Sequence, residues 1–332
     1  MLEEVERWLT RRSWSVADRS LDRLMAAKTA RGTTVSVVLP ALDEESTVGA
    51  IVSVVRRELM ERAPLVDELV VIDSGSSDAT AKVAAEAGAR VVHRDDILPR
   101  LPALPGKGEV LWRSLLVTDG DVVAFVDADL REFSADFVTG IVGPLLTEPD
   151  VQLVKAMYDR PLGSRGIPGA SAGPSAGPSA GQGGRVTELV ARPLLNLHWP
   201  LLAGFVQPLG GEYAARRTLL ERLPFPVGYG VELGLLVDAL HTVGLDALGQ
   251  VDVGTRLHRH QDDRALGRMA AAIYRTAQSR LSRSHLGAHL VRPELTQFER
   301  GENGFVPRTY DVDTEERPPM REIAEYTAGR AA

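Results

Sequence analysis

Short apolar runs that alternate with helical patterns constrain the fold of this chain more than any other feature. Four such runs lie in the first 130 residues, at 34–40, 68–73, 89–92 and 121–126. They are rich in Val, Leu and Ile, as are strands that are buried on both faces of a parallel sheet. A helical pattern separates each run from the next, which predicts a sheet wound by right-handed crossovers. The expected fold class is therefore α/β, a Rossmann-like, mostly parallel sheet flanked by helices.

Polar residues follow three of these runs at the point where each run ends. They are Pro40 to Glu44 after the first run, Ser74 to Asp78 after the second, and Asp127-Ala128-Asp129 after the fourth. In an open parallel sheet, ligands bind outside the carboxyl ends of the strands. Two aspartates one residue apart suit Mg²⁺ or a related cation, which takes one or two carboxylates while ligand phosphates complete its shell. Asp-Ala-Asp also occurs in turns and helix caps, so the motif alone leaves both interpretations open.

Composition excludes several classes of protein. The chain has 38 basic and 45 acidic residues and a net charge of −7, with no long basic run, so we expect no nucleic-acid partner. It has no cysteine, which excludes disulfides, thiolate catalysis and zinc-thiolate sites. No run of about 18 apolar residues predicts a transmembrane helix, so stable membrane insertion is not expected. The acidic N-terminus lacks the order of a signal peptide, and we expect a cytoplasmic protein.

Seven segments carry a resemblance to known enzymes. Three of them, 37–44, 71–80 and 127–129, resemble the GT-A-fold glycosyltransferases. Four more resemble the bacterial glucosyl-3-phosphoglycerate synthases, and they are 104–109, 184–188, 207–212 and 256–260. The likeness extends over about residues 30–290. This chain departs from typical members in a repeated Ser-Ala-Gly-Pro before Arg185.

The resemblance implies a GT-A fold and a retaining glucosyltransferase. Such an enzyme moves glucose from UDP-glucose to the 2-hydroxyl of 3-phospho-D-glycerate and forms glucosyl-3-phosphoglycerate, which feeds the synthesis of glucosylglycerate and methylglucose lipopolysaccharides. The resemblance also implies a divalent metal cofactor, Mg²⁺ or else Mn²⁺ or Co²⁺, and a homodimer.

The expected organisation has five parts. Residues 1–30 form a helical segment, and residues 31–162 form the nucleotide-sugar-binding half of a GT-A domain. Residues 163–184 consist mainly of Gly, Ser, Pro and Ala, a composition typical of a flexible loop. Residues 185–290 form the smaller half, which binds the acceptor and completes the metal site, and residues 291–332 form an extended C-terminal arm.

The resemblance assigns a set of residues to the nucleotide-sugar. They are Pro40, Ala41, Leu42, Glu44, Ser74, Lys107, Asp127, Ala128, Leu209, Gly210 and Glu232. Lys107 lies between two glycines, so its ammonium has room to reach a phosphate or a uracil oxygen. The alternatives are a strand terminator at Pro40, a first-turn helix charge at Glu44 and an ordinary exposed lysine at Lys107. Asp73 and Asp78 are equally compatible with structural roles, Asp78 as a helix cap.

The metal and the acceptor are assigned in the same way. The resemblance implies Asp129 and His258 as metal ligands, although a lone histidine is more often structural or exposed. Gly184, Arg185, Thr187 and His260 are assigned to the acceptor. A guanidinium suits bidentate binding of a phosphate or a carboxylate. From the sequence alone, a helix cap at Thr187 and a solvated Arg185 are equally compatible.

Glu232 and Asp127 are the expected catalytic carboxylates. The resemblance places Glu232 beside the sugar, where it orients the ring and stabilises positive charge at the anomeric carbon. Retaining enzymes of this fold are often argued to react by attack on the face of the leaving group, so a nucleophilic role for Glu232 is not required. Its alternative is an ordinary acidic residue in the first turn of a helix.

Other functions use similar sequence features. Within the same class they are a mannosyl-3-phosphoglycerate synthase and a polyprenyl-phosphate glycosyltransferase, the latter disfavoured by the lack of a membrane anchor. A sugar-phosphate nucleotidyltransferase usually has a basic, Gly-rich loop after the first strand, whereas this loop is acidic. A nucleotide-sugar sensor without activity would need neither Arg185 nor His258.

Overall fold

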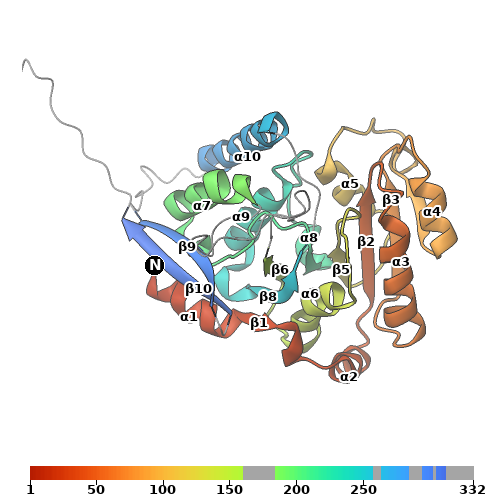
Figure 1. Cartoon of the computed structure of the whole chain (residues 1–332), viewed down its shortest axis with the longest axis horizontal. Coiled ribbons are helices and arrows are strands. Elements are labelled where there is room, and N and C mark those ends of the chain that lie inside the picture. Colours follow the sequence, from red (N-terminus) through yellow and green to blue (C-terminus); the bar gives the residue numbers. More distant parts are fainter. Residues whose placement is uncertain (160–183, 257–262, 284–293, 302–303, 312–332) are drawn as a thin grey trace, which may run out of the picture.

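The structure is a computed structural model, and it describes residues 1–159, 184–256, 263–283, 294–301 and 304–311 (Figure 1). Within these ranges, eight strands form one sheet in the order β1-β8-β6-β7-β5-β2-β3-β4. Their bounds are β1 Ser13–Ser15, β2 Val35–Ala41, β3 Glu68–Asp73, β4 Arg90–His93, β5 Val122–Phe125, β6 Leu153–Asp159, β7 Tyr213–Arg216 and β8 Leu248–Thr255. Every neighbouring pair is parallel except the two that β7 makes. The predicted α/β class with a mostly parallel sheet is confirmed.

Helices cover both faces of this sheet (Figure 1). The α-helices are α1 Glu3–Arg12, α2 Leu21–Arg31, α3 Val48–Arg56, α4 Thr80–Ala87, α5 Lys107–Ser114, α6 Asp136–Thr147, α7 Arg192–His198, α8 Arg217–Leu220, α9 Val231–Val243 and α10 Asp263–Arg283. Short 3₁₀ and π segments add η1 Val16–Asp18, η2 Arg57–Glu61, η3 Arg94–Asp96, η4 Thr187–Ala191, η5 Pro200–Leu202 and η6 Leu245–Ala247. No helix in these ranges is long and apolar enough to span a membrane.

The core lies in two layers, one on each face of the sheet. Successive strand residues point to opposite faces, so Val37 and Leu39 join the layer with α2, α3, α4 and α6. Val38 joins the layer with α1, α5, α7, α9 and α10. Because both faces are covered, β2 is apolar without alternation. Burial on both sides explains why the apolar runs of the sequence predicted these strands.

Two strands of the sheet, β1 and β7, are short. β1 has three residues, and β7 spans Tyr213–Arg216, directly before α8. The helix α8 covers only Arg217–Leu220. Strands of three or four residues are too short to show a period in the sequence. The antiparallel β7 separates β5 from β6 and thereby sets the two halves of the sheet apart.

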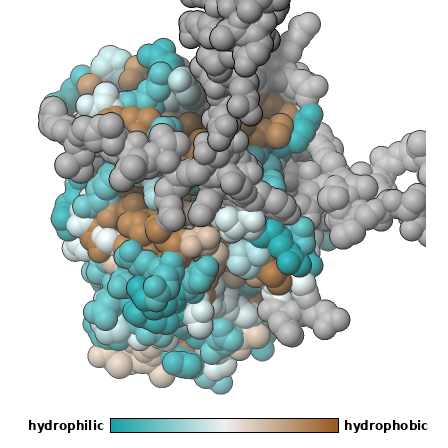
Figure 2. Space-filling model, turned by 90° about the vertical axis from the view of Figure 1, so that its left-hand side faces the viewer, coloured by the Kyte–Doolittle hydropathy of each residue, from teal (hydrophilic) through white to brown (hydrophobic). Residues whose placement is uncertain are grey.

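The predicted extended arm at 291–332 is wrong for its described part, which forms an antiparallel hairpin. Its strands are β9 (Glu294–Gly301) and β10 (Gly304–Asp311). Asn196 on α7 accepts a hydrogen bond of 2.8 Å from the backbone of Thr296, and Arg300 pairs with Asp159 at the end of β6 and with Asp252 within β8. Figure 2 views the end of the molecule that carries α1 and the hairpin, where hydrophobic patches alternate with hydrophilic ones. The hairpin is therefore docked on the domain.

Candidate active site

A cavity of about 670 Å³ opens at the carboxyl ends of β2, β3 and β5, and both halves of the chain line it. The predicted site residues that line it are Pro40, Ala41, Leu42, Glu44, Ser74, Lys107, Asp127, Ala128, Asp129, Gly184, Arg185, Thr187, Leu209 and Glu232. Gly210 lies next to Leu209 but is not part of the cavity wall. The predicted metal ligand His258 and the predicted acceptor-binding residue His260 lie outside the described residues. Strand direction thus brings together segments that are far apart in the sequence.

Two neighbouring loops form the end of the cavity beyond β2 and β3. Asp43 has a φ of 56° and its carboxylate accepts a hydrogen bond of 2.7 Å from the backbone of Ser77. Asp78 accepts bonds from the backbone of Glu45 (3.2 Å) and of Thr80 (2.9 Å). Asp73 accepts from Ser76. These bonds give Asp73 and Asp78 structural roles. The N-cap of α4 is Ala79 and not Asp78, so the predicted cap is wrong, and Asp78 instead joins the two loops. The loops bring Pro40, Ala41, Leu42, Glu44 and Ser74 to the cavity wall.

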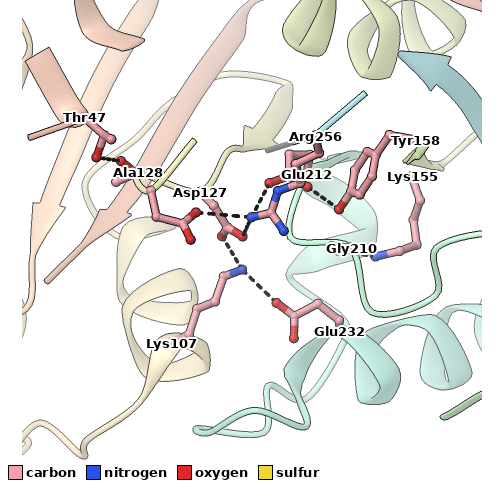
Figure 3. Close-up of polar contacts among 11 residues, drawn as sticks. Thr47, Lys107, Asp127, Ala128, Lys155, Tyr158, Gly210, Glu212, Glu232 and Arg256 are labelled. Atoms are coloured by element: carbon pink, nitrogen blue, oxygen red, sulfur yellow. Dashed lines mark hydrogen bonds and ion pairs between the residues drawn. The ribbon is translucent and has the colours of Figure 1, made fainter. Parts of the chain in front are cut away.

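Lys107 is the first residue of α5 and reaches into the cavity. Gly106, with a φ of 129°, and Gly108 both pack against the backbone of 226–228, where any side chain would collide with the carbonyls of Val227 and Pro226. The Lys107 Nζ lies 2.5 Å from Asp127 and 2.9 Å from Glu232 (Figure 3). Burial opposes its charge, but the two carboxylates outweigh burial and raise the pKa of Lys107 well above its usual range. Lys107 is therefore not an ordinary exposed lysine.

The Asp127-Ala128-Asp129 segment follows β5 and is fixed by its backbone. The Ala128 carbonyl accepts a 2.7 Å hydrogen bond from the Thr47 hydroxyl (Figure 3). The Asp129 side chain is 32% exposed and faces the cavity. Burial, followed by the negative charge of Asp127, raises the pKa of Asp129. An oxygen ligand that faces the cavity beside a second carboxylate fits a divalent cation.

Arg256 is the main site residue that the sequence did not single out. Arg256 directly follows β8. Its guanidinium lies 2.7 Å from Asp127, 3.2 Å from Asp129 and 3.1 Å from Glu212 (Figure 3). Its backbone N–H donates to the carbonyl of Asp159 on the neighbouring strand, which places the residue. One feature of the sequence pointed to this residue. Arg256 stands two positions before His258, which is predicted to bind the metal together with Asp129. The carboxylate of Glu212 is fully buried and also accepts a 2.6 Å bond from the Tyr158 hydroxyl.

The metal site is incomplete among the residues that the structure describes. No group of three or more His, Asp, Glu or Cys side chains in those ranges could hold a metal ion. Asp129 supplies one suitable ligand, and the predicted second ligand, His258, stands two positions after Arg256 in the sequence. The oxygen donor at Asp129 fits Mg²⁺ or Mn²⁺.

The opposite side of the cavity is formed by 184–187 and by α10. Gly184 has a φ of 96°, Arg185 is exposed at the wall, and Thr187 is buried at the start of the π-helical segment η4. Val186, rather than Thr187, occupies the N-cap position, so the interpretation of Thr187 as a cap is wrong. π-Helical segments are frequent at functional sites. An apolar wall that the sequence did not predict completes this side, with Leu266, Met269 and Ile273 from α10.

Glu232 is the second residue of α9, which begins after Gly230. Its carboxylate is 8% exposed and pairs with Lys107 at the cavity wall. Its position in the first turn also stabilises the helix, so the structural and the functional interpretation hold together. The cavity wall thus combines four carboxylates, four cations and an apolar side, and its charged members are Glu44, Asp127, Asp129, Glu232, Arg94, Lys107, Arg185 and Arg256.

The chain matches known proteins over most of its length. Residues 36–173 match the model of glycosyl transferase family 2. The glucosyl-3-phosphoglycerate synthase of Mycolicibacterium smegmatis is 48% identical over 314 residues, which cover 95% of this chain and 97% of the relative.

Solved structures are also similar to this chain over most of its length. The glucosyl-3-phosphoglycerate synthase from Mycobacterium tuberculosis, in complex with Mn²⁺, UDP-glucose and phosphoglyceric acid, has a TM-score of 0.68 and 45% identity, over 91% of this chain and 94% of that one. The mannosyl-3-phosphoglycerate synthase from Rubrobacter xylanophilus has a TM-score of 0.75 and 38% identity, over 96% and 99%.

Proposed function

This chain belongs to the glucosyl-3-phosphoglycerate synthases, and on that premise we propose that it transfers glucose from UDP-glucose to the 2-hydroxyl of 3-phospho-D-glycerate. The observation that carries the proposal is a single cavity shared by both halves of the chain. One half brings the loops after β2, β3 and β5, together with Lys107. The other half brings Arg185 and Thr187 for a small anion. A donor and an acceptor therefore fit side by side.

The donor is assigned to the first half. Pro40, Ala41, Leu42, Glu44 and Ser74 form the wall for uracil and ribose. The ammonium of Lys107 lies between Asp127 and Glu232, within reach of both a diphosphate and a sugar hydroxyl. Leu209 and Gly210 form the surface that the glucose ring contacts, with Ala128 beside it. In this proposal the anomeric carbon lies between the diphosphate and the residues that bind the acceptor.

The transfer breaks the bond between the anomeric carbon and the diphosphate oxygen and forms a bond to the acceptor's 2-oxygen. The acceptor approaches on the face of the leaving group, so the configuration is retained, and its proton passes to the leaving diphosphate oxygen. Glu232 and Asp127 orient the sugar and stabilise positive charge on the ring. Lys107 holds both carboxylates in place.

The enzyme uses a divalent metal, Mg²⁺ or else Mn²⁺ or Co²⁺, and we assign its protein ligands to Asp129 and His258, with the Asp-Ala-Asp segment as a DxD motif. When bound, the metal neutralises negative charge on the leaving diphosphate, a Lewis-acid role that supplies several kcal/mol.

The acceptor is assigned to Gly184, Arg185, Thr187 and His260. Arg185 suits bidentate binding of the phosphate or the carboxylate. Gly184 has no side chain, which leaves room for a small anion beside Thr187.

The test is product formation from UDP-[¹³C]glucose and 3-phosphoglycerate with Mg²⁺, followed by NMR at the anomeric carbon. An α-linked product supports donor, acceptor and retention together. Because the fold is also similar to a mannosyl-3-phosphoglycerate synthase, GDP-mannose is the matched alternative donor. Turnover with GDP-mannose and none with UDP-glucose would contradict the proposal.

Two further assignments belong to the same proposal. Both substrates are charged phosphorylated metabolites that do not cross membranes unaided, which supports a cytoplasmic enzyme. A homodimer is supported by the hydrophobic patches in Figure 2, the face with the hairpin, on which Val306 is 42% exposed. Light scattering of the purified protein measures its mass in solution, and a monomeric mass contradicts the dimer.

A further inference from the structure

Lys155 is a buried cation next to the site that the transfer described above does not use. It lies in the middle of β6 and is 2% exposed. Its ammonium donates a 2.8 Å hydrogen bond to the carbonyl of Gly210 (Figure 3) and lies 4.6 Å from the centre of the Tyr213 ring. Lysines are almost never fully buried unless they are paired. A buried ammonium that donates to a backbone carbonyl beside the site therefore requires an explanation.

The Gly210 carbonyl belongs to a turn at 207–212 that β6 holds by four hydrogen bonds. Besides the bond from Lys155, the backbone carbonyl of Tyr158 accepts a 3.0 Å bond from the Gln207 side chain, the Tyr158 hydroxyl donates to the Glu212 carboxylate, and the Ala156 backbone donates to the Glu212 carbonyl. Leu209 of this turn lines the cavity. Lys155 is the charged donor among these contacts, and a charged donor makes a stronger hydrogen bond.

The turn passes directly against the groups assigned to the sugar. At Gly211, an added Cβ would collide with the carboxylate of Asp127 and the ammonium of Lys107. A small displacement of the turn therefore changes the space that is left for the glucose ring. The uracil end of the cavity, at Pro40 and Ser74, lies at the ends of β2 and β3, which β5 separates from β7, the strand that follows the turn.

Charged groups on several elements surround Lys155. They are Glu232 on α9, Lys107 on α5, Glu212 before β7 and Asp127 after β5, and the ring of Tyr213 on β7 covers the ammonium. Burial lowers the pKa of Lys155 to about 8, against the raising effect of Glu232. The ammonium is thus a charged donor at neutral pH and loses its proton in mildly alkaline solution.

We propose that Lys155 is a positioning residue for donor recognition, which fixes the 207–212 turn against the glucose of UDP-glucose without touching it. The inference rests on the proposed function, because it takes UDP-glucose as the donor. It assigns part of the preference for the sugar to a buried side chain outside the cavity wall.

The test compares two ligands that share the uridine diphosphate and differ in the glucose and in the additional charge on the terminal phosphate of UDP. Calorimetry with Mg²⁺ gives the Kd of UDP-glucose and of UDP for the wild-type protein and for Lys155→Met, which keeps the length of the side chain and removes its charge and donor. We expect the Kd of UDP-glucose to rise on the order of tenfold, about 1.4 kcal/mol, and that of UDP to stay unchanged. Equal changes for both ligands, or none, overturn the inference.

Lys28→Met is the matched control. Lys28 is also buried and also donates to a backbone carbonyl, that of Pro64 at 2.7 Å, but it lies on α2 away from the cavity. Its loss should leave both Kd values unchanged. A wild-type protein that binds neither ligand would overturn the proposed donor and this inference with it. Wild-type binding of UDP-glucose with equal losses for both ligands in Lys155→Met overturns the inference alone.

A second measurement needs no variant, which matters if Lys155→Met does not fold. As pH rises through about 8, Lys155 loses its charge, so the affinity for UDP-glucose relative to UDP should fall between pH 7 and pH 9. Titration of the uracil is common to both ligands and cancels in the ratio. The terminal phosphate of UDP, which has no counterpart in UDP-glucose, has a pKa of about 6 and is ionised over this range. A constant ratio over this range overturns the inference.

Discussion

The two halves of the central sheet place their site residues in different ways. In the half with β4, β3, β2 and β5, every strand is parallel, and the site residues follow directly where the strands end. In the half with β7, β6 and β8, strand directions are mixed, and the site residues lie on a π-helical segment, on a turn and on the segment after β8. Strand direction positions the first set except for Lys107, which α5 holds against the backbone of 226–228. Tertiary contacts must position the second.

The halves are joined by ion pairs that cross between them. Lys107 of the first half pairs with Glu232 of the second, and Arg256 of the second pairs with Asp127 and Asp129 of the first. Each half therefore neutralises carboxylates of the other. The comparison teaches that the donor wall can form from local strand geometry, whereas the charged centre requires both halves to be folded.

The largest expected effect comes from removing either of the two proposed metal ligands, which belong to different halves. Asp129→Ala and His258→Ala should each lower Mg²⁺-dependent kcat by roughly a thousandfold, because several kcal/mol of charge stabilisation is lost. Steady-state rates over a range of Mg²⁺ concentrations measure the loss. Full activity in either variant would contradict the assignment of that ligand.

The next effect is on stability. Arg256→Met removes the cation that crosses from the second half and leaves the buried Glu212 unpaired, which should cost about 3 kcal/mol in urea unfolding at pH 8. Burial already raises the pKa of Glu212. Protonation at lower pH relieves the unpaired charge, so the loss should be smaller at pH 5 than at pH 8.

Arg300→Met is the control for that experiment. Arg300 also bridges two carboxylates, Asp159 and Asp252, but it is exposed. Its loss should cost about 1 kcal/mol or less. If the two variants lose the same free energy of unfolding, the ion pairs of Arg256 between the halves stabilise the fold no more than the exposed ion pairs of Arg300.

A smaller effect, confined to the acceptor, is expected from replacing Arg185 in the second half. Arg185→Ala should weaken binding of the acceptor, with a rise of about tenfold to a hundredfold in the acceptor's KM, as expected for a lost charge-assisted pair. The KM for UDP-glucose should change little. Arg222→Ala, an exposed arginine away from the cavity, is the control. Steady-state kinetics with each substrate varied in turn measure both constants, and equal changes in the two would refute the acceptor role of Arg185.

The smallest effect should come from the repeat. Deletion of residues 171–178, the two copies of Ser-Ala-Gly-Pro, removes no residue assigned to donor, acceptor or metal. Both KM values and kcat should stay close to those of the intact enzyme. A selective rise in the acceptor's KM would show that the repeat affects entry to the second half.

The sequence predicted more of the half with β2, β3 and β5 than of the half with β7, β6 and β8. β2, β3 and β5 were predicted because each is an apolar run that ends in polar residues, and the same pattern predicted the wall from Pro40 to Asp129. Arg256 was not singled out because its partner Glu212 lies in a distant segment, and nothing local marks a buried ion pair. β7 is too short to show a period, and the hairpin of β9 and β10 depends on docking against α7.

The first fifteen residues seal one edge of the sheet. Ser13–Ser15 pair with Gln250 to Asp252 on β8, and the buried indole of Trp8 donates to the Leu248 carbonyl. A chain trimmed to begin at β2 would expose the amides and carbonyls of β8, and open strand edges recruit other chains. Shortened forms of this enzyme should therefore aggregate edge to edge, even though every residue of the cavity is still present.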